Sequence, residues 1–263
     1  MPVALSAAET DAVVATLRAA GCVFAEDEAR LLIEAAASTS ELDDLVRQRA
    51  EGQPLEYLLG WVEFFGMRIG IDPGVFVPRL RTEFLVREAI ARARSGSVVL
   101  DLCCGCGAIG IAISSAIDGA ELYASDIEPA AVRNARRNFE LSGGRVFEGD
   151  LFDPLPDTLR GHVDILTANV PYVPTEAIAL LPPEARDYEP GVTLDGGVDG
   201  LDVLRRVAGE AHLWLATGGM LFVEVADEQA DAASMIFARA SLAPYVARSE
   251  HFNSVVVIGE RRA

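Results

Sequence analysis

Hydrophobic residues recur at helical spacing through the first fifty residues of the chain. Ser6-Ala7-Ala8-Glu9 has the form of a capping box, in which a serine and a glutamate satisfy the free N–H groups at a helix start. Apolar residues three and four positions apart follow it and recur in two further runs. The pattern predicts three short helices, from Ser6 to Gly21, over residues 27–37, and from a cap at Ser40 to residues 52–54.

The periodicity changes after this helical region. Residues 61–71 are rich in aromatic and β-branched side chains, with Gly66 and Gly70 as breakers, which predicts a hairpin. From Thr82 onward, strand and helix patterns alternate. We expect strands over 97–100, 121–125, 145–148, 163–168, 220–225, 246–248 and 254–258, and helices over 82–94, 107–117, 128–141, 201–215 and 227–240.

Alternation of this kind predicts an α/β fold in which helices cover both faces of a mostly parallel sheet. The last two strands form a closing pair, and we expect the C-terminal strand to run antiparallel. We therefore expect a small helical domain over residues 1–60, a hairpin linker over 61–78 and an α/β domain over 79–263. A chain of 263 residues is long enough to bury a large core in such a domain.

The composition narrows the class of protein. Hydrophobic residues make up 51% of the chain, but charged residues interrupt each apolar run before the roughly 18 residues that a membrane-spanning helix needs. The first five residues have no basic region ahead of an apolar one, which disfavours a secretory signal. We expect a soluble, cytoplasmic protein.

The net charge disfavours a nucleic-acid-binding surface. The formal charge is −18, and acidic residues are spread along the chain. Binding to a duplex depends on clustered Lys and Arg that neutralise phosphates. Arg133, Arg136 and Arg137 come nearest to such a cluster, and their spacing is typical of a solvated helix face. Nucleic acid is therefore a disfavoured partner, although it is not excluded.

A glycine-containing turn follows the first strand of the α/β region. Asp101-Leu102-Cys103-Cys104-Gly105-Cys106-Gly107 joins that strand to a helix, whose N-terminus offers free N–H groups to a carboxylate or phosphate. Asp126 ends the next strand, where an acid meets ribose hydroxyls in nucleotide-binding α/β folds, although it can equally cap the following helix. Asp150 and Leu151, after the third strand, could bracket an adenine. These features alone leave dinucleotide binding open.

The four cysteines are Cys22, Cys103, Cys104 and Cys106. Three of them fall within four residues, too close for a disulfide framework. A closed zinc site needs a fourth ligand, and no histidine lies nearby in the sequence. We expect no metal, and we interpret these cysteines as small side chains in a tight turn.

Asn169-Val170-Pro171-Tyr172 follows the apolar strand over 163–168, at the strand end where ligands bind in open α/β sheets. An amide nitrogen is a poor nucleophile and needs two acceptors to fix its two hydrogens. The Asn169 side-chain carbonyl and the Val170 main-chain carbonyl can supply them. Pro171 keeps Val170 extended, and Tyr172 offers a flat face for the amide and a π surface for a cation. The alternative is a plain turn without chemistry.

These residues resemble the protein-(glutamine-N5) methyltransferases, the PrmC or HemK family, from about Gln53 to the C-terminus. The resemblance rests on residues 53–60, 75–79, 101–109, 169–172, 189–190 and 194–201, the last reading Leu-Asp-Gly-Gly-Val-Asp-Gly-Leu. It implies a class I, Rossmann-like, S-adenosylmethionine-dependent methyltransferase domain preceded by a helical substrate-recognition domain. It also implies methylation of the glutamine in the Gly-Gly-Gln loop of peptide-chain release factors.

The resemblance also assigns the site. The expected catalytic residues are Asn169, Val170, Pro171 and Tyr172. The expected cofactor-binding residues are Asp101, Cys103, Cys104, Gly105, Cys106, Gly107, Asp126, Ile127, Asp150, Leu151 and Asn169.

This chain departs from the family pattern at three places. Asn-Pro-Pro-Tyr is Asn-Val-Pro-Tyr, Gly-Thr-Gly-Ser-Gly is the cysteine-containing turn, and Arg-Pro-Glu-Thr-Glu becomes Arg79-Leu80-Arg81-Thr82-Glu83. A paralogue that serves another protein would show the same pattern. Methylation of a base's exocyclic amine, methylation of a small-molecule amide, and cofactor binding without catalysis remain alternatives.

Overall fold

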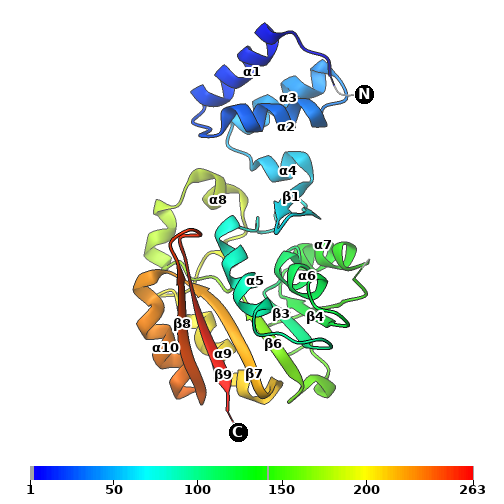
Figure 1. Cartoon of the computed structure of the whole chain (residues 1–263). Coiled ribbons are helices and arrows are strands. Elements are labelled where there is room, and N and C mark those ends of the chain that lie inside the picture. Colours follow the sequence, from blue (N-terminus) through cyan, green and yellow to red (C-terminus); the bar gives the residue numbers. More distant parts are fainter. Residues whose placement is uncertain (1–2, 141, 263) are drawn as a thin grey trace.

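The computed structural model describes residues 3–140 and 142–262 (Figure 1). Seven strands form its central sheet in the order β5-β4-β3-β6-β7-β9-β8. All neighbours pair in parallel except β9, which is antiparallel to both β7 and β8. The strands are β3 (Val98–Leu102), β4 (Glu121–Asp126), β5 (Arg145–Glu148), β6 (Val163–Ala168), β7 (Leu215–Val225), β8 (Leu242–Ser249) and β9 (Ser254–Arg261). The predicted α/β class with a C-terminal antiparallel strand is confirmed.

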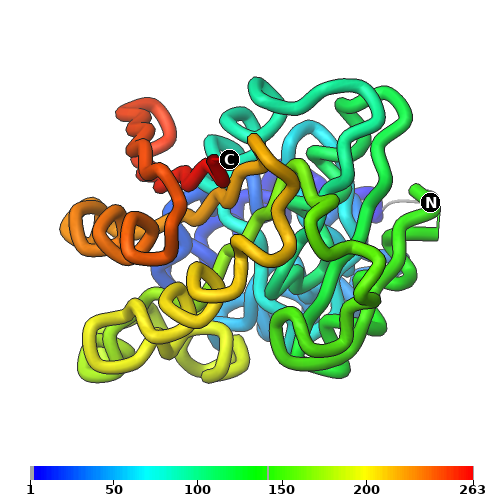
Figure 2. The backbone as a smooth tube through the Cα atoms, turned by 90° about the horizontal axis from the view of Figure 1, so that it is seen from below, coloured from blue at the N-terminus to red at the C-terminus, as the bar shows by residue number. Residues whose placement is uncertain are grey.

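Side chains alternate between two hydrophobic clusters on the two faces of the sheet. Val99 packs with helices α5, α6 and α7, whereas Leu100, its neighbour on β3, packs with α9 and α10. Figure 2 shows the C-terminal hairpin at one edge of the sheet and the green β4–β5 region at the other. The helices are α5 (Glu83–Ile90), α6 (Ala108–Ser115), α7 (Pro129–Phe139), α9 (Asp202–Trp214) and α10 (Ala230–Arg239).

Three helices at the N-terminus share a hydrophobic core of their own, and Figure 1 shows them apart from the sheet. They are α1 (Ala7–Ala19), α2 (Ala25–Ala35) and α3 (Thr39–Ala50). The Ser6 capping box is present. The predicted cap at Ser40 is wrong, because the Ser38 hydroxyl accepts the Glu41 N–H and the helix begins at Thr39. A short helix α4 (Leu55–Leu59) was not predicted.

The predicted hairpin is present as β1 (Trp61–Phe64) and β2 (Met67–Gly70), so Gly70 ends a strand. It is more than a linker, because Val62, Phe64 and Ile69 belong to the hydrophobic cluster on the α5–α7 face of the sheet. The division of the chain at residues 60 and 78 stays a prediction.

Most other boundaries move by a few residues. The helix expected over 227–240 is a 3-10 turn (Asp227–Gln229) followed by α10, and the strand expected from 220 begins at Leu215. The segment after β6, for which we predicted neither helix nor strand, contains α8 (Pro183–Tyr188) between 3-10 turns over Thr175–Leu180 and Gly191–Thr193. Leu141, the expected end of the helix from 128, lies outside the described residues.

Candidate active site

The register of the sheet brings the ends of three strands together. Leu102 at the end of β3 pairs with Ser125 of β4 on one side and with Ala168 of β6 on the other. The residues that follow are therefore neighbours at the carboxyl edge of the sheet, and they are Cys103, Asp126 and Asn169. The strand order also reverses between β3 and β6, the topological switch point where α/β sheets bind ligands.

A cavity of about 750 Å³ opens at this edge. The turn after β3, the end of β4, the segment after β6 and the α8 region all contribute to its wall. The predicted site residues that line it are Cys103, Cys104, Gly105, Cys106, Asp126, Ile127, Asn169, Val170, Pro171 and Tyr172. The fold thus places the two sequence motifs, some sixty residues apart, in one cavity.

Asp101 and Gly107, predicted as cofactor-binding residues, do not line the cavity. Asp101 is fully buried, and its carboxylate accepts hydrogen bonds from the Gly110 N–H (2.9 Å) and the Thr167 hydroxyl (2.8 Å). It therefore ties β3 to α6 and β6 beneath the turn. Gly107, with φ of +83°, is the N-cap of α6, and a Cβ there would collide with the Phe139 ring.

Asp150 and Leu151 also lie off the cavity wall. The Asp150 carboxylate pairs with Arg206 at 2.6 Å, on the α9 side of the sheet. The Leu151 side chain is buried in the hydrophobic cluster of that face, and its carbonyl accepts the Ser125 hydroxyl at 2.6 Å. The sequence could not show this, because the direction of these side chains depends on how the turn after β5 packs.

Asp126 accepts a hydrogen bond at the start of α7 and lines the cavity wall, and its role in binding ribose hydroxyls stays a prediction. One carboxylate oxygen accepts the Gly105 N–H (2.8 Å) in the turn, and the other accepts the Glu128 N–H (2.9 Å) at the start of α7. Burial raises the pKa of this carboxyl, while the hydrogen bonds from Glu128 and Gly105 lower it. Asp126 thus shapes the turn and presents a carboxylate at the cavity wall.

The cysteines of the turn are free thiols. Burial raises the pKa of Cys103 and Cys104, and raises that of Cys106 to about 12, so these groups are neutral thiols near pH 7. Within residues 3–140 and 142–262, no group of three His, Cys, Asp or Glu residues is arranged to hold a metal ion. All three cysteines line the cavity, and their interpretation as small side chains in a tight turn stays a prediction.

We refer to Asn169-Val170-Pro171-Tyr172 as the transfer motif. Its Asn169 side-chain oxygen is shielded from water and accepts no hydrogen bond from the described residues. A buried acceptor without a partner is uncommon and costs free energy, and one that lies at a cavity wall can be satisfied by a donor on a ligand. Val170 turns its side chain into the core on the α9 side of the sheet. The motif therefore keeps an unused acceptor at the cavity.

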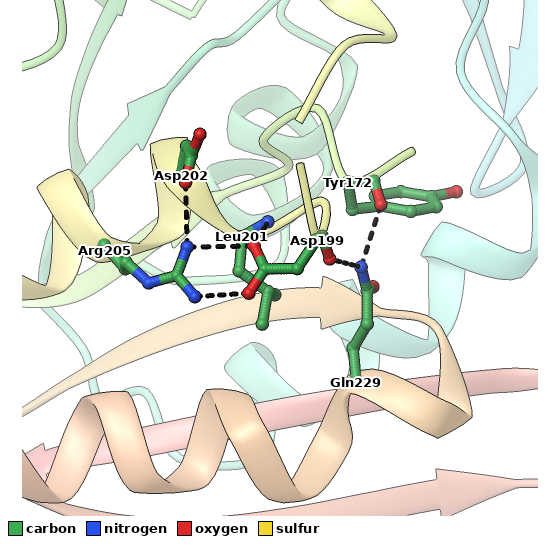
Figure 3. Close-up of polar contacts among 6 residues, drawn as sticks. All are labelled: Tyr172, Asp199, Leu201, Asp202, Arg205 and Gln229. Carbon is green, nitrogen blue, oxygen red and sulfur yellow. Dashed lines mark hydrogen bonds and ion pairs between the residues drawn. The ribbon is translucent and has the colours of Figure 1, made fainter. Parts of the chain in front are cut away.

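The glycines of residues 194–201 pack against the backbone of the transfer motif. A Cβ on Gly196 would lie 2.7 Å from the Pro171 carbonyl oxygen, and one on Gly200 would collide with the Tyr172 carbonyl. Gln229, which the sequence did not single out, binds both segments. Its side-chain N–H groups donate to the Tyr172 carbonyl (2.9 Å) and to the Asp199 carbonyl (3.0 Å), as Figure 3 shows.

Arg205 fixes Asp199, the second residue that Gln229 binds. It pairs with the Asp199 carboxylate and, at 2.8 Å, with Asp202. The Leu201 N–H also donates to the Asp199 carboxylate at 3.2 Å. Residues 194–201 thus pack against the main chain of the transfer motif and help to fix its position. Gln229 gave no signal in the sequence, because its role depends on the packing of the turn before α10.

Comparison with known proteins identifies the family. The family described as "Methyltransferase small domain" matches residues 67–180. The release factor glutamine methyltransferase of Geobacter sulfurreducens is 41% identical over 197 residues, which cover 74% of this chain and 68% of that protein. The protein of the same name from Thermodesulfovibrio yellowstonii is 33% identical over 221 residues, covering 80% and 78%.

This chain belongs to the release factor glutamine methyltransferase family. A third relative differs in name: the 4-amino-L-phenylalanine/4-methylamino-L-phenylalanine methyltransferase of Streptomyces pristinaespiralis is 36% identical, covering 68% of this chain and 63% of that protein. A methyltransferase from Pyrococcus furiosus has the same fold, with a TM-score of 0.58 at 16% identity over 76% of this chain and 91% of that one. Methyltransferase activity follows from membership of the family. No helix in the described part of the chain is long and apolar enough to cross a bilayer.

Proposed function

We propose that this protein transfers a methyl group from S-adenosylmethionine to the side-chain nitrogen of a protein glutamine, the one in the Gly-Gly-Gln loop of a peptide-chain release factor. The observation that supports this most directly is the unpartnered, shielded oxygen of Asn169 at the wall of the cavity. A primary amide brings the N–H donor that this acceptor needs. The names of the relatives in Geobacter sulfurreducens and Thermodesulfovibrio yellowstonii point to the same substrate.

The cavity wall fits the cofactor. Cys103 to Cys106 form a turn at the N-terminus of α6, which suits the carboxylate of an amino-acid moiety, and Asp126 offers acceptor oxygens for ribose hydroxyls. Ile127 adds an apolar surface beside Asp126. These residues would hold S-adenosylmethionine, and the bound cofactor supplies an electrophilic methyl group on its sulfonium.

The residues of the transfer motif orient the acceptor. The Asn169 side-chain carbonyl and the Val170 main-chain carbonyl accept the two N–H hydrogens of the glutamine amide, which fixes the nitrogen and increases its electron density. The Tyr172 ring lies against the planar amide. S-adenosylmethionine, when bound, would supply the methyl group and keep the C–S bonding pair on its sulfur, and the glutamine nitrogen would lose one proton to water. Positioning and electrostatics therefore replace a general base.

A free amino acid that carries an amine is the second candidate, because one relative is named for 4-amino-L-phenylalanine. Such a substrate also brings a carboxylate, which calls for a cation. Of the described residues, Arg79 and Arg81 are the cations at the cavity wall, and each is paired with a buried carboxylate, Glu189 at 2.7 Å and Glu224 at 3.0 Å. The pairing leaves no free cation for the substrate and favours the protein glutamine.

The deciding experiment mixes the purified protein with S-adenosylmethionine and release factors, followed by peptide mass spectrometry of the Gly-Gly-Gln fragment. We expect one added methyl on that glutamine. Asn169→Ala should reduce the rate by a factor on the order of 100 through lost positioning, while cofactor affinity, measured by calorimetry, changes little.

Two outcomes would contradict the proposal. An unmodified fragment despite measurable cofactor binding would exclude the release factor as substrate, and methylation of 4-amino-L-phenylalanine in the same preparation would support the second candidate. Undiminished transfer by Asn169→Ala would remove the role given to the side-chain acceptor. A base amine as acceptor would be indicated by steeply salt-dependent binding of nucleic acid, which the net charge of −18 disfavours.

A further inference from the structure

Arg81 enters the active-site cavity beside the transfer motif. Its guanidinium donates a hydrogen bond to the Tyr172 hydroxyl and lies 5.6 Å from the centre of the Tyr172 ring. The residue belongs to the 3-10 turn Leu80–Thr82, more than ninety residues before Tyr172 in the sequence, and it lines the same cavity. Arg81 therefore contacts a predicted substrate-binding side chain at its hydroxyl end.

A buried carboxylate fixes Arg81 in turn. Arg81 Nε lies 3.0 Å from Glu224 Oε1, and Glu224, near the end of β7, is only 3% exposed. The Ser254 hydroxyl also donates to Glu224 at 3.5 Å. Burial raises the pKa of Glu224, but the Arg81 charge lowers it. A central sheet strand thus anchors the arginine, although its own side chain is 42% exposed.

We infer that Arg81, anchored by Glu224, is a positioning residue that holds the Tyr172 ring in place for methyl transfer. This inference rests on the proposed function for its kinetic readout. Gln229 fixes only the Tyr172 main chain, so the side-chain torsions of Tyr172 need a separate restraint. The planar guanidinium can bind Glu224 through Nε and Tyr172 through a terminal nitrogen at the same time, which a lysine ammonium on one flexible stem cannot reproduce.

The arrangement also explains the arginine at position 81, where the resemblance leads us to expect an acidic residue. An acid there would face the buried Glu224 and repel it, whereas the arginine neutralises it. The charge reversal is therefore matched by a partner within this chain. Pairing with Glu224 makes it an internal restraint on Tyr172, with no charge left over for a substrate.

The kinetic test is a double-mutant cycle on the full-length protein. Arg81→Ala and Tyr172→Phe should each lower kcat by about tenfold, with little change in cofactor affinity. The double variant should be no slower than the slower single variant, because both changes remove the same contact. Arg81→Lys keeps a charge for Glu224, so it should fold as stably as the wild-type chain and still lose most of the kcat.

Two kinetic outcomes would overturn the inference. If the losses multiply in the double variant, Arg81 acts independently of the Tyr172 hydroxyl. If Arg81→Ala raises KM for the acceptor and leaves kcat unchanged, Arg81 binds the substrate directly. A wild-type chain that leaves the Gly-Gly-Gln glutamine unmodified contradicts the proposed function instead, and a second readout then decides the inference.

The second readout is the nuclear magnetic resonance signal of the Tyr172 ring, which can be measured without a methyl acceptor. In protein with isotope-labelled tyrosine, Arg81→Ala and Glu224→Gln should both shift the Tyr172 ring resonance, because both release the restraint. Arg145→Ala is the matched control, since Arg145 lies 5.7 Å from the Tyr123 ring at the β5 edge and should shift Tyr123 alone. An unchanged Tyr172 resonance in Arg81→Ala would refute the contact and with it the inference.

Discussion

Asp101 stabilises the active site although its side chain does not line the cavity. Its carboxylate connects β3, α6 and β6 through hydrogen bonds to Gly110 and Thr167, while no solvent reaches it. Burial raises its pKa to about 7, despite the opposing effect of those hydrogen bonds. The turn over residues 103–107 is therefore stabilised by a carboxyl group whose charge changes near neutral pH, and the stability of the turn depends on that charge.

Replacing this acid should alter the pH dependence of stability. The folded pKa lies above the ordinary value of 3.8, so the folded chain binds the proton more tightly than the unfolded chain. The stabilisation is complete below the unfolded pKa and is lost as the pH rises through the folded pKa. Between these values, Asp101 should lower the free energy of unfolding by up to about 1.4 kcal/mol per pH unit.

Urea unfolding of the cofactor-free protein at about pH 5, 6 and 7 measures this slope, and the difference between variants separates Asp101 from other buried carboxyls whose pKa is also raised, such as Asp126, Glu189 and Glu224. Asp101→Asn keeps an acceptor for the Gly110 N–H and cannot ionise, so the free energy of unfolding should decline less steeply with pH than in the wild-type chain. Asp11→Asn, on the exposed surface of α1, is the control and should follow the wild-type slope. Identical slopes for all three proteins would show that Asp101 does not titrate in this range.

Among the elements, the segment over 194–201 decides the shape of the transfer motif. Gly200 has φ of +75° and touches the Tyr172 carbonyl, and Gly196 lies beside the Pro171 carbonyl. Gln229 then joins Tyr172 and Asp199. Since Asn169 precedes these contacts by only a few residues, a displacement of the segment would move the acceptor atoms.

Gly200→Ala tests this element. The added methyl would collide with the Tyr172 carbonyl at a backbone conformation that favours glycine, so we expect a loss of roughly 1–3 kcal/mol in the free energy of unfolding. We also expect methyl transfer to fall by a factor on the order of 100, since the acceptor atoms shift. Denaturant unfolding and the peptide assay measure the two effects.

Gly209→Ala is the matched control. Gly209 lies in α9 with open space around the position of a Cβ, so alanine should leave activity intact and raise stability by up to about 1 kcal/mol. Equal activities of Gly200→Ala and Gly209→Ala would mean that residues 194–201 do not position the transfer motif.

At the scale of the whole molecule, the N-terminal helices and the α/β part of the chain make contact near the cavity. The N-terminal helices have their own core, and Arg49 of α3 connects it to the segment beside the site. The Arg49 guanidinium binds the buried Glu28 at 2.6 Å and lies 3.5 Å from Glu184 of α8, which lines the cavity. The Tyr188 hydroxyl also donates to the Glu51 carbonyl at 3.3 Å. We propose that the helical part holds a protein substrate over the cavity.

A truncated variant that begins at Gln53 tests whether the N-terminal helices are needed for recognition of the protein substrate but not for cofactor binding. The deletion removes the N-terminal core but leaves both clusters of the sheet intact, so we expect S-adenosylmethionine affinity to stay close to that of the full chain. Methylation of the release factor should fall by a factor on the order of 100, because the orienting contacts are lost. Calorimetry and peptide mass spectrometry give the two values, and circular dichroism checks the fold. Equal loss of both activities would point to a folding defect instead.

The hydrophobic pattern was enough to predict the order of the strands from residue 82 onward, and that of the helices except α8. The central strands β3, β6 and β7 fall on largely apolar runs because both faces of the sheet are covered there, whereas the edge strand β5 (Arg145–Glu148) has no buried residue. Boundaries were less certain. The shift from Ser40 to Ser38 reflects two serines that can both cap a helix, and only the packing of α3 selects between them.

The sequence by itself determined the fold class, the family and the motif residues that line the cavity, since strand periodicity and the residues at strand ends are local properties. The tertiary structure alone decided which polar side chains meet. It placed Asp101 beneath the turn and Asp150 beside Arg206, brought Arg81 and Gln229 to Tyr172, and paired Glu224 with Arg81. These contacts join residues more than fifty positions apart, or depend on the direction of a turn. No local pattern encodes such a direction, because it is set by packing on the whole sheet.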